Sequence, residues 1–446
     1  MESITKQALN AINTLKEKNN YRYLGKYSQK DSYPLDLSSN DYLNLANTSW
    51  EQVASRVFTD SNNGRVNYSS LSQIVLNFLK ERQAYPLPRG ATGSRLLSGD
   101  NYWVEAIEKD LSQLLAPYNK DCLFYNSGYH ANMGILPPLV KLHPQSSIVI
   151  MDKLVHASLI DGVILAGVKF KRFAHNDITD LKIKVKQAVE SGYTNIFLAL
   201  ESIYSMDGDN LSKEQVLEII QLKKEYEEVA NIIIYVDEAH AVGLFGQFSL
   251  GMIDSYGLLK DIDIIVCPLG KAINSSGALV LTNKTIREYL INTSRSLIYS
   301  TSLGVETIVA TATNLIYANH NDTQQEANRL LNLTNEFRLF LKEKIKARLT
   351  KNQEYLAEEM VGGDNQIVSF IVGSNTAVID LANYLSEHGI LVGAIKSPTV
   401  PKNFERLRIC FNTTLLQEQS KLTLLKETFS SYTSSDDFLK ILTQKL

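Results

Sequence analysis

Charged side chains stand directly after apolar segments in the middle of the chain. Asp152, Glu201 and Asp237 each end such a segment, and Lys271 closely follows a fourth. Continuous apolar runs of this length are typical of strands that are covered on both faces. Because open α/β sheets bind ligands beyond the carboxyl ends of their strands, we expect these side chains to gather at one site.

The segment around Asp237, "VDEAHAVGLFG" (236–246), contains the letters D-E-A-H, which also occur in nucleotide-driven motors. Such a motor needs an upstream phosphate loop of the pattern GxxxxGK[ST]. The sequence "PLGKAIN" lies downstream and has no Ser or Thr after Lys271, and "RGATGSRLLSG" has no lysine. The pattern therefore does not favour a nucleotide-hydrolysing motor.

A metal site is a second alternative, because several histidines could meet in space: His130, His143, His156, His175 and His240. No HExxH motif and no paired-cysteine spacing supports such a site. A single histidine at a strand end is more often a hydrogen-bonded structural residue than a ligand. We therefore expect no metal.

Pyridoxal phosphate is a third alternative, and it needs four groups from a protein. A lysine forms the Schiff base, a carboxylate keeps the pyridine nitrogen protonated, a flat group stacks on the ring, and a helix start binds the phosphate. Asp237 and Lys271 follow neighbouring strand candidates, and Ser127, Gly128 and Tyr129 lie where a helix should begin. Each residue alone could be a solvated lysine or a plain turn, but the combination favours the cofactor.

The elements that position these residues are predicted to form an α/β domain around a largely parallel sheet. A helix with Ser212 and Gln215 spaced as a capping box lies between two of the strands. A long helical stretch over 305–346 and a smaller α+β unit, with a helix ended by Gly389, follow. The strand candidates of the sheet are "SIVIMD" (147–152), "NIFLALE" (195–201), "NIIIYVDE" (231–238), "DIIVCPL" (263–269) and "GALVLT" (277–282).

The bulk composition is that of an ordinary globular protein. The 446 residues carry a formal net charge of -3, with 44% apolar and 21% charged residues. This balance provides no basic field for nucleic acid, and three scattered cysteines fit a reducing compartment. The N-terminal "MESITKQALNAINTLKEKNN" indicates a polar amphipathic helix, and no apolar run reaches membrane-spanning length. We expect a cytoplasmic protein that binds neither nucleic acid nor membrane.

The order of motifs along nearly the whole chain resembles the α-oxoamine synthases, a pyridoxal-phosphate family of fold type I. The motifs that carry this resemblance are "LSSNDYLNLA" (37–46), "GATGSRLLSGD" (90–100), "FYNSGYHANMGIL" (124–136), "DKLVHASLIDG" (152–162), "ESIYSMDGD" (201–209), "VDEAHAVGLFG" (236–246), "LGKAINSSGALV" (269–280), "LIYSTSL" (297–303) and "AIKSPTVPKNFERLRICFN" (394–412).

The resemblance implies three parts of the chain. Residues 1–48 would be an N-terminal arm that joins the small domain, residues 49–300 the large cofactor-binding domain with a mostly parallel sheet, and residues 301–446 the linking helix and the smaller α+β domain. It also implies a homodimer with shared active sites. The polar segment 50–88 lies outside the match.

The resemblance implies the cofactor contacts residue by residue. Lys271 would carry the Schiff base, Asp237 would pair with the pyridine nitrogen, His240 would hydrogen-bond the ring oxygen, and His156 would stack on the ring. Catalysis would depend on these four residues. The remaining cofactor-binding residues would be Ser127, Gly128, Tyr129, Ser205 and Thr301, the last reaching the phosphate of the partner subunit.

The resemblance also implies the substrate contacts. Asn40 and Arg408 would hold the amino-acid carboxylate, for which the guanidinium fork is well shaped. Arg22 and Thr399 match positions on the path of the acyl substrate, and the stacking ring of His156 would border the substrate.

Within the family, "AIKSPTVP" and "RFAHND" are most similar to the members that condense L-alanine with a pimeloyl thioester, on CoA or acyl-carrier protein, in biotin biosynthesis. Alternatives are members that use glycine with acetyl-CoA, serine with a long-chain acyl thioester, or 2-aminobutyrate to make signalling α-hydroxyketones. A non-catalytic binding protein that kept the fold is a more distant alternative.

The chain departs from the family pattern at three places. Pro268 stands where a Thr or Ser usually contacts the cofactor phosphate, and proline offers neither a hydroxyl nor an N–H. Lys396 and Ser397 replace an arginine and a proline, and the histidine that usually follows "RLRI" is absent.

Overall fold

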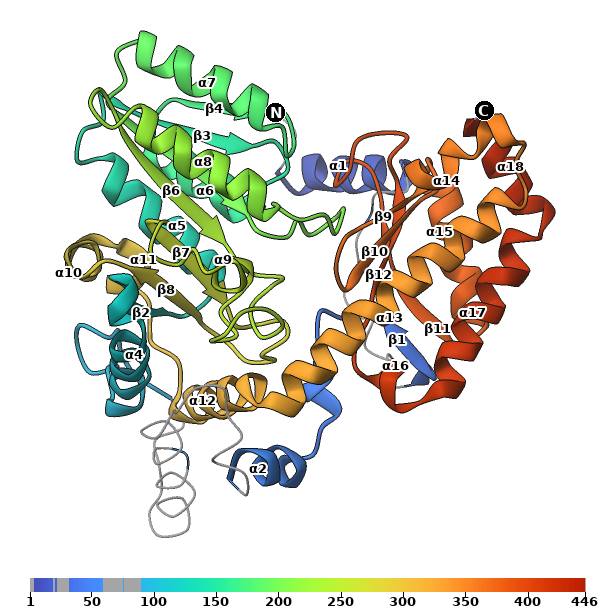
Figure 1. Cartoon of the computed structure of the whole chain (residues 1–446), viewed down its shortest axis with the longest axis horizontal. Coiled ribbons are helices and arrows are strands. Elements are labelled where there is room, and N and C mark those ends of the chain that lie inside the picture. The colour runs from blue at the N-terminus through green and yellow to red at the C-terminus, as the bar shows by residue number, and fades with distance from the viewer. Residues whose placement is uncertain (1–3, 19–20, 22–31, 59–74, 76–89, 446) are drawn as a thin grey trace. The chain divides into compact units, whose positions relative to one another are not determined.

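The computed structural model describes residues 4–18, 21, 32–58, 75 and 90–445, and it divides into two compact units (Figure 1). The smaller unit comprises the chain up to Tyr42, the short segment Ser205–Asp209, and Asn328–Leu446. The larger unit comprises Leu43–Tyr204 and Asn210–Ala327. Each unit is described by itself below.

A seven-stranded sheet forms the centre of the larger unit, with strand order β2-β8-β7-β6-β5-β3-β4. Strands β4, β3, β5, β6 and β7 are parallel, whereas β8 runs antiparallel to both β7 and β2. The mostly parallel α/β sheet expected from the sequence is thereby confirmed. The strands are β2 (Asp121–Tyr125), β3 (Ser147–Asp152), β4 (Phe170–Phe173), β5 (Asn195–Glu201), β6 (Asn231–Asp237), β7 (Ile264–Pro268) and β8 (Ala278–Thr282).

Helices cover this sheet because its strands carry apolar side chains on both faces. One face packs against α5 and α6 through a buried cluster that includes Val149, Phe197 and Tyr235. The predicted capping box is present at α8, where Ser212 and Gln215 exchange hydrogen bonds. The helices are α2 (Trp50–Phe58), α4 (Tyr102–Leu115), α5 (Gly128–Val140), α6 (Ala157–Ala166), α7 (Ile178–Glu190), α8 (Lys213–Glu225), α9 (Met252–Tyr256), α10 (Lys284–Thr293), α11 (Arg295–Ile298) and α12 (Val305–Asn319), with short 3-10 turns η2 (Leu45–Asn47) and η3 (Ala116–Tyr118).

The long helix predicted over 305–346 is two helices. Helix α12 ends at Asn319, and α13 (Asn321–Lys346) begins two residues later. Between them His320 has an extended backbone, with φ −67° and ψ 142°. The eight residues 319–326, "NHNDTQQE", are all polar, so the apolar pattern of the two helices is interrupted at this break.

A five-stranded sheet of order β1-β11-β12-β10-β9 forms the smaller unit, and only its β1–β11 pair is parallel. Phe337, Phe370, Phe411 and Phe429 lie in its buried core. The elements are α1 (Ile4–Glu17), β1 (Leu35–Leu37), η4 (Lys351–Gln353), α14 (Tyr355–Met360), β9 (Val361–Gly362), β10 (Ile367–Ile371), α15 (Asn375–Glu387), β11 (Ile390–Ile395), β12 (Arg406–Cys410), α16 (Thr414–Gln417), α17 (Gln419–Thr433) and α18 (Asp436–Lys445).

The described residues contain neither a membrane-spanning helix nor a metal-binding cluster. None of their helices is both long enough and apolar enough to cross a membrane. No group of three or more His, Cys, Asp or Glu side chains among them is arranged to hold a metal ion. Most of the segment 50–88, beyond α2, lies outside the described residues.

Candidate active site

The side chains of Lys271 and His240 meet in the larger unit. Lys271 follows β7, His240 follows β6, and Nζ of the lysine lies 2.7 Å from Nε2 of the histidine. At this distance one proton is shared, so the ammonium and the doubly protonated imidazole cannot coexist. The contact fixes the position of an amine that could act as a nucleophile.

Asp237 ends β6 and is almost fully buried, with 4% of its surface exposed. Oδ1 accepts a hydrogen bond from the backbone N–H of Ala239 at 2.9 Å, and Oδ2 accepts one from the Asn132 amide at 2.7 Å. Both donors stabilise the ionised form of the carboxylate. The arrangement provides a fixed negative charge at the carboxyl edge of the sheet.

A second buried carboxyl lies beside Asp237 on the neighbouring strand. Glu201 ends β5, pairs with Asp237 in the register of the two strands, and accepts a hydrogen bond from the backbone N–H of His156. Burial, together with the nearby charge of Asp237, raises the pKa of Glu201 to about 8. Two adjacent carboxyls in unequal surroundings can thus differ in charge at neutral pH, with the proton on Glu201.

His156 is the N-cap residue of helix α6, and its ring is hydrogen-bonded to the first turn of that helix. Nδ1 accepts a hydrogen bond from the backbone N–H of Ser158 at 3.2 Å and lies 2.8 Å from its hydroxyl. The ring of Tyr129 stands edge-on to it at 6.5 Å between centroids. The Tyr129 hydroxyl donates to Asp161.

Sequence reasoning missed Asn132, which lies one turn into α5. Its amide contacts Asp237, Ser158 and the Tyr235 hydroxyl, all of them buried. The letters "SGYHANMG" do contain this asparagine, but nothing in a single sequence distinguishes it from an ordinary helix residue. Only the packing of α5 against β6 brings it to Asp237.

The N-terminus of α5 offers a place for an anion. Ser127 caps the helix and accepts a hydrogen bond from the N–H of His130, and Gly128 is the first helical residue. Unpaired N–H groups of a first turn and the helix dipole attract a phosphate. The helix has 13 residues, so its dipole is well developed.

Pro268, the departure from the family pattern, packs against this helix start. A Cβ built on Gly128 would lie 2.6 Å from Cγ of Pro268, which is closer than real carbon contacts allow. The proline ring therefore occupies the space beside Gly128. The glycine is required there because the ring leaves no room for a side chain.

Thr301 lies beyond α11 and is exposed, and its backbone carbonyl accepts a hydrogen bond from Asn126 Nδ2 at 2.6 Å. Asn126 directly precedes the cap residue of α5. The structure thus brings Thr301 close to the helix start at the level of its backbone.

In the smaller unit, Arg408 is buried within a set of acceptors. Its Nε donates to the carbonyl of Ser205, and Nη1 donates to Asn40 Oδ1 at 2.9 Å and to Cys410 Sγ at 2.8 Å. Nη2 lies 3.4 Å from the hydroxyl of Tyr42. The guanidinium has five N–H bonds, and among the described residues one bond on Nη2 is left for a further acceptor such as a carboxylate.

The remaining predicted substrate residues are less well defined. Thr399 is exposed, and its N–H donates to the carbonyl of Lys396 at 2.9 Å in the turn that follows β11. Arg22 lies outside the described residues. The structure therefore groups Asn40, Ser205 and Arg408 in one unit, and Asp237, His240 and Lys271 in the other.

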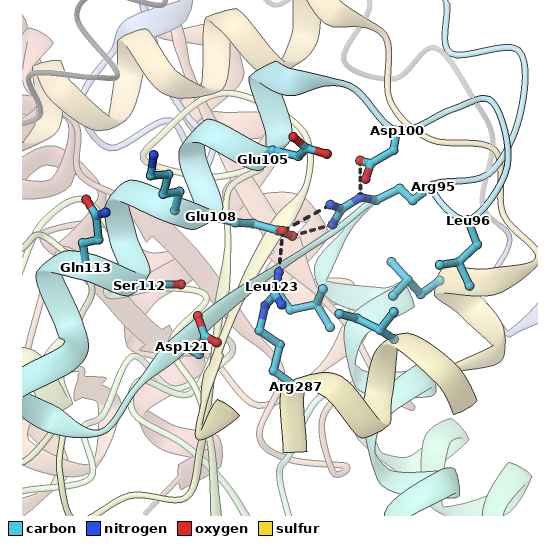
Figure 2. A pocket seen from close by; sticks show the side chains of 13 residues that line it. Arg95, Leu96, Asp100, Glu105, Glu108, Ser112, Gln113, Asp121, Leu123 and Arg287 are labelled. Atoms are coloured by element: carbon cyan, nitrogen blue, oxygen red, sulfur yellow. Dashed lines mark hydrogen bonds and ion pairs between the residues drawn. The ribbon is translucent and has the colours of Figure 1, made fainter. Parts of the chain in front are cut away.

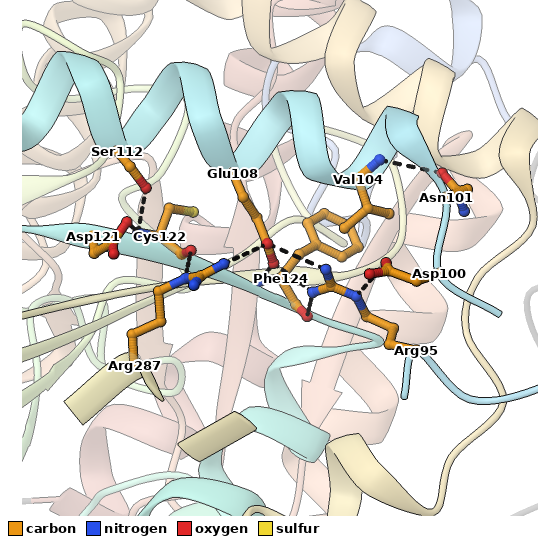
Figure 3. A network of polar contacts seen from close by, with 10 residues as sticks. All are labelled: Arg95, Asp100, Asn101, Val104, Glu108, Ser112, Asp121, Cys122, Phe124 and Arg287. Carbon is orange, nitrogen blue, oxygen red and sulfur yellow. Dashed lines mark hydrogen bonds and ion pairs between the residues drawn. The ribbon is translucent and has the colours of Figure 1, made fainter. Parts of the chain in front are cut away.

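The motif at 90–100 is fixed by a buried ion network on α4 (Figure 3). Glu108 accepts hydrogen bonds from Arg95, from Arg287 Nη2 at 2.8 Å and from the N–H of Phe124 at 2.7 Å. Arg95 also donates to Asp100 at 2.9 Å. One carboxylate thereby holds the 90–100 loop, α10 and β2 together.

A cavity of about 460 Å³ lies beside this network (Figure 2). Its lining is mostly charged and includes Glu105, Lys109 and Asp121 besides the network residues. None of Lys271, Asp237 and His240 belongs to the lining. The cavity is a separate feature of the larger unit.

The groups of the larger unit fit pyridoxal phosphate. Lys271 provides an amine next to a base, Asp237 provides the anion for a pyridine nitrogen, and the capped helix α5 provides the phosphate contacts. The match rests on the chemical types of these residues. A Schiff-base lysine is needed for pyridoxal phosphate, whereas a metal or a nucleotide does not require one.

Comparisons with known proteins point the same way. The family model for aminotransferase class I and II matches residues 34–421. An 8-amino-7-oxononanoate synthase of Haemophilus ducreyi is 36% identical over 390 residues, which cover 86% of this chain and 88% of the relative.

Solved structures share the fold. A serine palmitoyltransferase from S. paucimobilis, with bound PLP-myriocin, has a TM-score of 0.70 at 20% identity and covers 97% of this chain and 98% of its own. An 8-amino-7-oxononanoate synthase from Francisella tularensis has a TM-score of 0.58 at 24% identity, covering 89% of this chain and 98% of its own.

Proposed function

We propose that this chain, which belongs to the aminotransferase class I and II family, is a pyridoxal-phosphate enzyme that makes 8-amino-7-oxononanoate. It would condense L-alanine with a pimeloyl thioester and release CO2 and the free thiol. The observation that carries the proposal is the contact between Lys271 and His240 beside the buried anion of Asp237. The identity to the relative from H. ducreyi supports the substrate class.

Lys271 would hold the cofactor and then move the substrate proton. When bound, pyridoxal phosphate supplies an electron sink for the charge left at the amino-acid α-carbon. Lys271 Nζ would take the α-proton in its neutral form, and His240, 2.7 Å away, would hold the amine in place by a hydrogen bond. The same amine can return a proton after CO2 has left.

Asp237 and His156 would hold the ring. The carboxylate of Asp237 keeps the pyridine nitrogen protonated by charge attraction, and this protonation makes the ring a strong electron acceptor. The imidazole of His156 covers one face. The capped start of α5, with Ser127, Gly128 and Tyr129, would bind the phosphate, assisted by Ser205 and, from the partner subunit of a homodimer, by the residue equivalent to Thr301.

Arg408 and Asn40 would orient the amino acid. One N–H on Nη2 of Arg408, which has no acceptor among the described residues, would bind a carboxylate, and the other contacts keep the guanidinium from turning. Orientation matters twice, since the C–H bond and later the C–CO2 bond must stand perpendicular to the conjugated plane. Arg22 and Thr399 would contact the acyl chain.

Turnover with a matrix of substrates tests the function. Alanine, glycine, serine and 2-aminobutyrate would be combined with acetyl, pimeloyl and palmitoyl thioesters, each on CoA and, for pimeloyl, on acyl-carrier protein. Alanine with the pimeloyl thioester is expected to have the highest kcat/KM. A preference for serine with the palmitoyl thioester, or for any other pair, would assign the chain to another member of the family.

Cofactor uptake by the purified protein tests the alternative of a non-catalytic role. Purified protein loaded with pyridoxal phosphate is expected to be yellow, and reduction with borohydride should bleach it and leave the cofactor covalently attached to a peptide that contains Lys271. A colourless protein that takes up no cofactor would reject the proposed function.

A further inference from the structure

The buried amide of Asn132 joins the two residues that would hold the cofactor ring. Its Nδ2 donates to Asp237 Oδ2 at 2.7 Å and to Ser158 Oγ at 2.8 Å, and its Oδ1 accepts from the Tyr235 hydroxyl at 2.5 Å. Asn132 and Ser158 are each 1% exposed, and Tyr235 is fully buried. A chain of hydrogen bonds thus runs from Asp237 through Asn132 and Ser158 to His156.

The orientation of this amide follows from its partners. A carboxylate oxygen at 2.7 Å accepts hydrogen bonds, so the NH2 group of Asn132 must face Asp237. The opposite orientation would place Oδ1 against Oδ2 of Asp237, oxygen against oxygen. Tyr235 reinforces the choice, because its hydroxyl can donate to Oδ1. Both Nδ2 hydrogens are then used, one by Asp237 and one by Ser158.

The same reasoning fixes the proton of His156. The backbone N–H of Ser158 cannot rotate, and it points at Nδ1 of the imidazole from 3.2 Å. Nδ1 must therefore present its lone pair. The Ser158 hydroxyl accepts from Asn132 and has its own hydrogen left to donate to Nδ1 at 2.8 Å. Because Nδ1 accepts two hydrogen bonds, the imidazole is neutral and carries its proton on Nε2.

The electrostatic surroundings of His156 agree with a neutral ring. Loss of hydration lowers the pKa of His156, the charge of Asp237 opposes this, and Lys271 lowers it further. The charge of Asp161 also raises the pKa of His156, and its effect is the smallest of the four. The net direction is downward.

We infer that Asn132 and Ser158 are positioning residues that hold Asp237 as an anion and His156 as the neutral Nε2–H tautomer. The inference rests on the proposed function for its purpose. A neutral imidazole can stack on a protonated pyridine ring without the repulsion of two like charges. The anion of Asp237, with its two lone-pair sites already oriented, keeps a fixed direction toward the ring nitrogen.

Nitrogen NMR of the full chain labelled with 15N-histidine tests the tautomer, with and without pyridoxal phosphate. A His156→Asn variant assigns the signals. At neutral pH the wild type is expected to show an unprotonated Nδ1 and a protonated Nε2. Ser158→Ala keeps the backbone N–H but loses the hydroxyl donor, so it is expected to keep this tautomer and to shift the Nδ1 resonance, because the hydrogen bonding at Nδ1 is weaker. A wild-type His156 protonated at Nδ1, or at both nitrogens, would overturn the inference.

The affinity for pyridoxal phosphate tests whether Asn132 keeps Asp237 ionised and correctly oriented. Asn132→Asp puts a second carboxyl against Asp237, so the two would share a proton and the anion would be weakened. Asn132→Asp and Asn132→Ala are each expected to raise the dissociation constant of pyridoxal phosphate at least about tenfold. Tyr235→Phe, which loses only the donor that orients the amide, is expected to raise it about threefold.

Asn195→Asp is the matched control. Asn195 begins β5, at the end of the sheet remote from Glu201, and its amide contacts Ser146. This variant is expected to bind pyridoxal phosphate within about twofold of the wild type. Folded Asn132→Ala with wild-type cofactor affinity would overturn the positioning role, and should Asn132→Ala fail to fold, Tyr235→Phe and Ser158→Ala decide instead.

The two proposals fail separately. If the wild type takes up no pyridoxal phosphate, the proposed function is wrong, yet the tautomer of His156 in the cofactor-free chain still decides the hydrogen-bond chain. If the cofactor binds and the tautomer is reversed, the function stands and this inference falls.

Discussion

Glu201 and Asp237 face each other as the last paired residues of β5 and β6, and both are buried. Two carboxyls at adjacent strand ends cannot both be ionised without cost. Asp237 has two N–H donors, whereas burial and the charge of Asp237 raise the pKa of Glu201 to about 8. The pair therefore keeps one charge and one proton near neutral pH.

This pair predicts how stability depends on pH. Because the pKa of Glu201 is near 4.5 when unfolded and about 8 when folded, the folded chain binds more protons between these values. The contribution of Glu201 to stability is complete below pH 4.5 and is lost as the pH rises toward 8. In urea unfolding of the cofactor-free chain, the free energy of unfolding of the wild type falls as the pH rises from 4.5 to 8. In Glu201→Gln this fall is expected to be smaller by about 1–3 kcal/mol.

Glu238 contributes in the same direction, since burial raises its pKa to about 7, so some slope should remain in the Glu201→Gln variant. The exposed Glu190→Gln serves as control and should leave the slope unchanged. An equal slope in wild type and Glu201→Gln would show that Glu201 does not hold the proton.

Removing the amine at 271 should abolish the chemistry. Lys271→Ala is expected to lower turnover at least about 1000-fold, because the variant lacks the amine that would form the Schiff base and take the α-proton. Mass spectrometry after borohydride reduction should show cofactor attached to the wild type and not to the variant. Lys260→Ala, at an exposed lysine, should behave as the wild type, and covalent attachment in Lys271→Ala would identify another lysine as the carrier.

Asp237→Asn should separate fold from function. A carboxamide has one oxygen, so it can accept from either Ala239 or Asn132 but leaves the other donor facing an NH2 group. We expect a loss of about 1–3 kcal/mol of stability and a much larger loss of turnover, because the ring nitrogen no longer has an anion beside it. Near-normal turnover would contradict the role of the anion.

Arg408→Lys should weaken the hold on the amino acid. The ammonium replaces a planar fork that contacts Ser205, Asn40 and Cys410 at once. We expect KM for the amino acid to rise at least about tenfold, with a smaller change in KM for the thioester. Cys410→Ser retains an acceptor for Nη1 and should change KM little, and an unchanged KM in Arg408→Lys would remove Arg408 from the carboxylate site.

Glu108→Gln should destabilise the larger unit. The change leaves the guanidinium groups of Arg95 and Arg287 without their shared buried anion, which typically costs about 3–5 kcal/mol. Glu105→Gln, on the exposed side of the same helix, is the control and should lie within about 0.5 kcal/mol of the wild type. Chemical unfolding of both variants would show no difference if the network were unimportant.

Much of the large sheet follows from the sequence because its strands are apolar on both faces. The strands ending at Asp152, Glu201 and Asp237 have the predicted ends within one residue, since each stops where a carboxylate replaces an apolar residue. The antiparallel direction of β8 does not follow, because apolar runs have no direction.

The site was predictable where a residue acts through its own chemistry. A lysine and a carboxylate after neighbouring strands predict a shared ligand, and in the structure Lys271 contacts His240, three residues after Asp237. Asn132 and Ser158 act only through their neighbours, so their position in the fold had to be known first. The attachment of residues 205–209 to the smaller unit likewise follows only from contacts in the fold, such as those of Ser205 with Arg408 and of Asp207 with Arg406.

The close approach of Pro268 to Gly128 constrains how this protein can evolve. A side chain at 128 collides with the proline ring, so mutation there is tolerated only after 268 has become smaller. Cβ of Pro268 itself lies 2.8 Å from that position, so a serine or threonine at 268, which keeps a Cβ, would exclude a side chain at 128 as well. Relatives with any side chain at position 268 are therefore expected to retain glycine at position 128.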